Sequence, residues 1–94
     1  MKIVVSPPAR EDLKQAYQQI TQDNPKAADR MLARIIEVIG MLASGSVEGR
    51  EVRLQDGRPV HMWPVPPYRI YYRKHVDLFE VIRVYHQARR PIER

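Results

Sequence analysis

Arginine and tyrosine side chains are interleaved in one part of this 94-residue chain, and a histidine follows them. Tyr68–Arg73 has high β propensity, and strand residues two apart share a face, so Arg69 and Arg73 should lie on one side. The next apolar run, Leu78–Tyr85, is followed directly by His86. Guanidinium groups bind phosphate or carboxylate, aromatic rings stack on bases, and imidazole transfers protons near neutral pH. These residues could therefore bind nucleic acid or an acidic protein surface, and could also cleave RNA.

Pairing of the two strands would bring Arg69 and Arg73 near Arg83 or His86, on the face opposite the two helices expected upstream. Strict alternation along the second strand places Arg83 on the same face as Val81 and opposite His86, although a slip of one residue would exchange the faces. If the protein is a ribonuclease, the catalytic candidates are Arg69, Arg83, Tyr85 and His86. The candidates for binding a macromolecular target are Arg69, Arg73, Arg83, His86, Arg89 and Arg90. Ordinary strand composition also accounts for each residue taken singly.

Several other kinds of site are disfavoured by the residue types and their spacing. The chain has no cysteine, which excludes disulfides, thiolate metal sites and a cysteine nucleophile. Its three histidines, His61, His75 and His86, are widely separated and have no nearby pattern of carboxylates. There is no glycine-rich phosphate loop and no serine nucleophile motif. We therefore expect no metal and no cofactor, and a binding protein is favoured over an enzyme.

Charge and length bound the possible partners. Sixteen Lys and Arg residues outnumber eleven Asp and Glu, which gives a formal net charge of +5 and attraction to nucleic acid, an acidic protein or a membrane surface. No apolar run approaches the roughly 18 residues of a membrane span, and Ile3–Val5 is too short for a signal peptide core. The sequence predicts one domain over residues 1–94, located in the cytoplasm and without a membrane partner.

The first half of the chain has the pattern of a strand followed by two helices. The β-branched run Ile3–Val5 predicts a short strand. Ser6 follows it and is a candidate N-cap for the first helix. Apolar residues then recur at helical spacing from Ala9 to Ile20. Asn24-Pro25 ends this helix and begins a second amphipathic one, which stops at Ser44–Ser46. A connection this short predicts an antiparallel helix hairpin.

After Gly49 the apolar period changes towards two, which indicates strands. The expected strands are Glu51–Leu54, Val60–Val65, Tyr68–Arg73 and Leu78–Tyr85. Pro64 suggests an edge position or a bulge, because proline cannot donate to a ladder. The order of elements predicts an α+β fold with a short N-terminal strand, a helix hairpin and a three- to four-stranded, mainly antiparallel sheet. The first strand should join that sheet to satisfy its backbone groups.

Short motifs in the same order over most of the chain resemble the RelE/ParE family of toxins. They are Pro8–Leu13 at the first helix, Asn24–Ala28 at the helix turn, Gly49-Arg50, Tyr68–Tyr72 and Ile82–Arg89. The ending Arg-Val-Tyr-His-Gln-Ala-Arg is most similar to the ParE branch. The strand cations are arginines rather than the lysines of RelE, and the residues after Arg89 include no tyrosine or histidine.

The resemblance implies a toxin held inactive by a co-expressed, ParD-like antitoxin. ParE-like members inhibit DNA gyrase, whereas RelE-like members cleave messenger RNA on the ribosome without a metal. In the second case Arg69, Arg83 and His86 would match family positions. A third alternative is a non-toxic module that only binds its antitoxin. The antitoxin is expected on the helix hairpin and the neighbouring sheet edge, with Leu13, Tyr17, Arg30 and Arg34 as candidate contacts.

Overall fold

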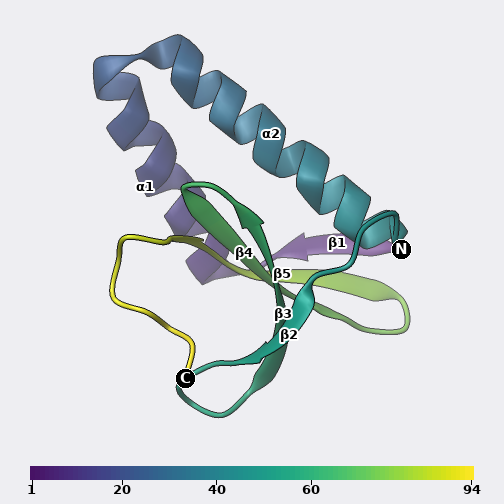
Figure 1. The fold of residues 1–94 in the computed structure, drawn as a ribbon. Helices are drawn as coiled ribbons and strands as arrows, with labels where there is room; N and C mark the ends of the chain where they lie inside the picture. Colours follow the sequence, from purple (N-terminus) through teal and green to yellow (C-terminus); the bar gives the residue numbers. More distant parts are fainter.

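A computed structural model describes all 94 residues and confirms the expected α+β architecture. The two helices lie on one face of a five-stranded sheet, as Figure 1 shows. The N-terminal strand is one of the five, so the sheet combines it with four later strands. The elements are β1 (Lys2–Val5), α1 (Pro7–Asp23), α2 (Pro25–Ser44), β2 (Arg50–Arg53), β3 (Pro59–Val65), β4 (Tyr68–Lys74) and β5 (Leu78–His86).

Local capping explains where the helices begin and end. The Ser6 hydroxyl accepts a hydrogen bond from the Ala9 amide at 3.2 Å, and the Asn24 side chain accepts one from the Ala27 amide at 3.1 Å. Each cap satisfies one of the free amides of a helix N-terminus. Gly45 ends α2 with φ of 83°, a left-handed conformation that glycine adopts without strain. The predicted cap at Ser6, the helix boundary at Asn24-Pro25 and the stop at Ser44–Ser46 are therefore confirmed.

The sheet order is β1-β5-β4-β3-β2, with β1 parallel to β5 and the other pairs antiparallel. The apolar strand β5 lies between β1 and β4, which fits its two apolar faces. Pro64 pairs with Arg69 of β4, but β2 reaches only as far as Met62 along β3. The outer edge of β3 is free at Pro64, so the predicted edge position is confirmed.

A β-bulge in β5 breaks the expected alternation of side chains. Tyr71 of β4 pairs with Arg83, and Tyr72 pairs with Val81, so Ile82 is an extra residue on β5. Val81 consequently faces the helices while Arg83 faces away from them. The expectation that Val81 and Arg83 share a face was wrong, because periodicity alone does not reveal an inserted residue.

The sheet has a core on each face. Thirteen buried residues, including Ile35, Tyr72 and Phe79, form the larger core beneath the helices. Six others form a smaller core on the opposite face, where Ile92 of the C-terminal segment packs against them. This segment pairs beside β2, since the Gln55 amide donates to the Ile92 carbonyl at 2.8 Å and the Arg94 amide to the Arg53 carbonyl at 2.9 Å. Figure 1 shows it in yellow, returning to the β2–β3 end of the sheet.

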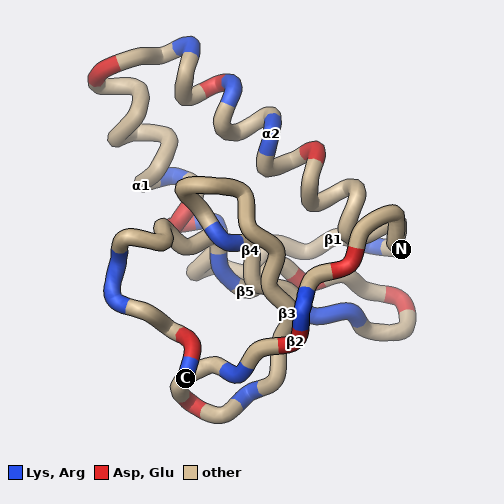
Figure 2. Tube along the Cα trace, viewed as in Figure 1, with Lys and Arg blue, Asp and Glu red and all other residues tan.

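The positive charge belongs to the sheet half of the chain. Residues 50–94 contain ten Lys or Arg and five Asp or Glu, a net charge of +5, whereas residues 1–49 contain six of each. Figure 2 shows that acidic positions interrupt the basic ones along both helices. An acidic partner would therefore be attracted to the sheet and the C-terminal segment more than to the hairpin. Neither helix is both long and apolar enough to cross a membrane.

Candidate functional site

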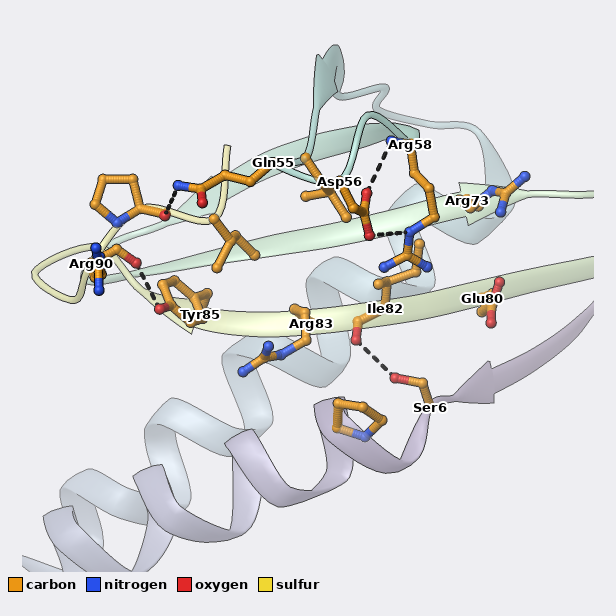
Figure 3. Close-up of a pocket in the computed structure, with 14 residues that line it drawn as sticks. Ser6, Gln55, Asp56, Arg58, Arg73, Glu80, Ile82, Arg83, Tyr85 and Arg90 are labelled. Carbon is orange, nitrogen blue, oxygen red and sulfur yellow. Dashed lines mark hydrogen bonds and ion pairs between the residues drawn. The ribbon is translucent and has the colours of Figure 1, made fainter. Parts of the chain in front are cut away.

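A cavity of about 850 Å³ opens on the sheet face opposite the helices. Its walls come from β4, β5, the turn between β2 and β3, the C-terminal segment and the start of α1 with its cap Ser6, as Figure 3 shows. Arg73, Arg83, Tyr85 and Arg90 all line it. Three of the six target-binding candidates therefore surround one cavity, together with an aromatic side chain.

Arg83 is held by an acidic residue of the first helix. Its Nε donates to Asp12 Oδ2 at 2.7 Å, and its Nη2 donates to Asp12 Oδ1 at 2.8 Å. The hydrogen bond with Asp12 raises the pKa of the guanidinium further. Figure 3 shows the Arg83 side chain pointing from β5 towards α1. The cation also lies 5.1 Å from the centre of the Tyr85 ring, so both partners fix its position.

Asp12 also completes the edge of β5 where β1 ends. The β1 pairing reaches only Val81, beyond which the backbone groups of β5 need other partners. The Ser6 hydroxyl donates to the Ile82 carbonyl at 2.8 Å, and Asp12 Oδ2 accepts from the Val84 amide at 3.1 Å. Sequence analysis missed Asp12. The available signal was an acid at i+3 from Ala9, on the buried face of the helix.

Arg69 lies on the same face but is bound by the C-terminal segment. Its Nη1 donates to Glu93 Oε2 at 3.2 Å, and the Tyr71 hydroxyl donates to the same oxygen at 2.5 Å. Burial, and then the hydrogen bond to Glu93, raise the pKa of Tyr71 to about 12. Glu93 was also missed, since no local pattern joins it to a strand 24 residues away.

His86 lies on the other face of the sheet. It pairs with Tyr68 across β4 and β5, and the two rings meet edge to face with centres 5.3 Å apart. Its Nδ1 accepts a hydrogen bond from the Ala88 amide at 3.0 Å. The possibility that His86 joins the arginines opposite the helices was wrong. The four ribonuclease candidates are thus divided between two faces, with only His86 on the helix side.

The remaining target candidate, Arg89, is also on the helix side. It lines a smaller cavity with His86, and its Nη2 lies 3.4 Å from the Gln15 side-chain oxygen of α1. The six candidates therefore form three groups rather than one surface. Arg73, Arg83 and Arg90 line the large cavity, Arg69 is paired with Glu93, and His86 and Arg89 line the small one.

The antitoxin candidates on the hairpin differ in how available they are. Leu13 packs against the main core, and the Tyr17 hydroxyl donates to Asp29 at 2.6 Å. Arg34 pairs with Glu37 at 3.0 Å, while Arg30 is exposed. Two further residues, missed in the sequence, are apolar and exposed: Ile3 on the edge strand β1 is 44% exposed and Ile36 on α2 is 59% exposed. Exposed apolar side chains on a strand edge and a helix are suited to a protein partner.

Comparisons with known proteins agree with this architecture. No curated protein matched the chain. Among solved structures, the chain is similar to one described as the chromosomal ParDE TA system from P. aeruginosa, with 18% identity and a TM-score of 0.72 over 92% of this chain and 95% of that one. At that identity the likeness establishes the fold. A family model described as "ParE toxin of type II toxin-antitoxin system, parDE" matches residues 3–91. The chain therefore belongs to the ParE toxin family of type II toxin–antitoxin systems.

Proposed function

We propose that this protein is a toxin that inhibits DNA gyrase by binding to it. The observation that carries the proposal is the separation of the candidate acid–base groups. Arg83 is bound to Asp12 on one face, and His86 lies on the other. Cleavage of RNA requires proton transfer beside a single phosphate, which groups on opposite faces of a sheet cannot share. This separation supports binding over hydrolysis.

The large cavity is the proposed surface for gyrase. Arg73 and Arg90 line it without a side-chain hydrogen bond, and Tyr85 supplies an aromatic surface between Arg90 and Arg83 (Figure 3). Arginine and tyrosine are the residue types that most often carry binding energy at protein interfaces. The net charge of residues 50–94 would also speed association with an acidic surface.

A supercoiling assay with purified toxin tests the proposal. The protein should inhibit gyrase, and Arg73→Ala and Arg90→Ala should each weaken inhibition by about tenfold. Arg34→Ala is the matched control, because Arg34 is exposed on α2 and does not line the cavity. Unchanged gyrase activity at micromolar toxin would reject the proposal.

A cognate antitoxin is the second proposed partner, bound on the hairpin and the free edge of β1. Exposed Ile3 and Ile36 supply apolar contacts, and Arg30 supplies a cation for an acidic segment. Ile36→Asp should weaken the purified complex by at least about tenfold, while Gln18→Asp, an exposed change on α1, should not. Normal growth when the soluble toxin is expressed alone would instead favour a non-toxic module.

One observation favours a ribosome-dependent ribonuclease as the alternative. The Arg83–Tyr85 stack borders a cavity large enough for a nucleotide, and such a pair can hold a base and a phosphate. Transcript cleavage on translating ribosomes distinguishes the two functions. Cleavage that is lost in Arg83→Ala would support the ribonuclease, and intact transcripts with the unaltered toxin would reject it.

A further inference from the structure

A second cavity, of about 270 Å³, lies between α1 and the end of β5 and has chemistry of its own. It shares no lining residue with the large cavity. Side chains from three parts of the fold meet there: Gln15 and Gln19 of α1, Tyr68 of β4, and His86 with Arg89 at the end of the sheet. Three of the polar groups that line it can donate hydrogen bonds to a ligand: Tyr68, His86 and Arg89.

His86 presents a donor to this cavity for a geometric reason. Its Nδ1 accepts the Ala88 amide at 3.0 Å, so in the neutral ring the proton must be on Nε2. The Nε2–H group has no partner within the protein. The ring is also fixed by its edge contact with Tyr68, so the donor has a defined place.

Tyr68 and Arg89 add two further donors. Tyr68 is 7% exposed as a residue, and its hydroxyl, which makes no hydrogen bond within the protein, is accessible to solvent. Burial raises the pKa of Tyr68, whereas the positive charge of Arg89, which lines the same cavity, lowers it. Arg89 itself has only the 3.4 Å contact with Gln15.

The acidic residue that lines the cavity is already engaged. Asp12 accepts two hydrogen bonds from Arg83 and one from the Val84 amide. Its charge is therefore balanced by Arg83 rather than by Arg89. One free cation beside neutral donors matches a ligand with a single negative charge and several acceptor lone pairs. A phosphate dianion would require more positive charge than this cavity supplies.

We infer that this cavity is a carboxylate-binding site that takes an Asp or Glu side chain of a polypeptide partner. The carboxylate accepts from the Arg89 guanidinium, His86 Nε2 and the Tyr68 hydroxyl. A cavity of this size admits one acidic side chain and excludes a folded element. The inference goes beyond the gyrase and antitoxin assignments, because the cavity contains none of the residues proposed to contact either partner.

Amide and side-chain NMR of the full-length protein tests the inference, with the capped peptide Gly-Glu-Gly as the probe. The signals of Ala88, Arg89 and the His86 ring should shift saturably, with a dissociation constant in the millimolar range. The capped peptide Gly-Gln-Gly, which differs only in charge, should bind at least about tenfold more weakly. Equal binding of the two peptides would overturn the inference. The absence of a saturable shift at Glu-peptide concentrations well above the millimolar range would also overturn it.

Three variants and a second anion identify the groups involved. Arg89→Gln should weaken binding of the Glu peptide about tenfold, and Tyr68→Phe, which removes only the hydroxyl, about threefold. Lys14→Gln is the matched control, since it removes one positive charge from an exposed position on α1 outside both cavities and should leave binding unchanged. An equal effect of Lys14→Gln would indicate only surface charge and overturn the inference. Tighter binding of inorganic phosphate than of the Glu peptide at the same signals would also overturn it, in favour of a phosphate site. Spectra of the free variants show whether each remains folded.

Discussion

Asp12 of α1 and Arg83 of β5 are 71 residues apart in the chain and form a two-point ion pair, with N–O distances of 2.7 and 2.8 Å. The carboxylate is 7% exposed and also binds the Val84 amide. The pair joins the first helix to β5 at the point where β1 stops pairing. It therefore sets both the wall of the large cavity and the edge of the sheet.

Replacing Asp12 should destabilise the fold strongly. Asp12→Asn leaves a partly buried guanidinium without its counter-charge, so the free energy of unfolding should fall by about 2–3 kcal/mol. Glu11→Gln, an exposed change one residue away, should alter it by less than about 0.5 kcal/mol. Chemical denaturation of both variants measures the difference. Equal losses would mean that the ion pair has no special role.

The C-terminal segment should loosen when Glu93 loses its charge. Glu93→Gln weakens the contacts with Arg69 and Tyr71, at a cost of about 1 kcal/mol in unfolding free energy. Hydrogen exchange should become faster at two amides that hold this segment against β2. The Gln55 amide donates to the Ile92 carbonyl, and the Arg94 amide donates to the Arg53 carbonyl. Glu51→Gln on the exposed side of β2 is the control, and equal acceleration there would contradict a specific role for Glu93.

Stability should fall at high pH because of Tyr71. The pKa of its phenol is raised by burial from 10.0 to about 12, so the folded state keeps it neutral where the unfolded chain ionises. The stabilising contribution is complete below pH 10 and is lost as the pH rises towards 12. Burial also raises the pKa values of Tyr68 and Tyr72, which add to the same trend. Between pH 10 and 12 the free energy of unfolding should fall less steeply with pH for Tyr71→Phe than for the unaltered protein. An equally steep fall would contradict the role of Tyr71.

Two glycines should respond to alanine in opposite directions. A Cβ on Gly49 would collide with the Met62 carbonyl oxygen, so Gly49→Ala should destabilise the protein by about 1–3 kcal/mol. A Cβ on Gly40, within α2, would meet nothing within 4 Å. Gly40→Ala should stabilise the protein by about 0.5–1 kcal/mol, because alanine favours the helix. Thermal melting of the two variants tests the pair, and a shift in the same direction for both would contradict the structure.

The elements and their order follow from the sequence because their signals are local. The Ser6 and Asn24 caps, the stop at Gly45 and the change from a helical to a strand period each depend on residues a few positions apart. The fold class follows from that order. The family also follows from short motifs, because they are read along the chain without knowledge of contacts.

Only the tertiary structure decided which chemistry the candidate residues share. The extra residue Ile82 exchanges the faces of β5 partway along the strand, and periodicity gives no sign of it. The partners of Arg83 and Arg69 are carboxylates 71 and 24 residues away, brought close by packing rather than by any local pattern. The arginine, tyrosine and histidine residues that could have formed one surface are therefore divided between two cavities and the Arg69–Glu93 ion pair. Side chains distant in sequence meet only once the sheet register and the helix packing are set.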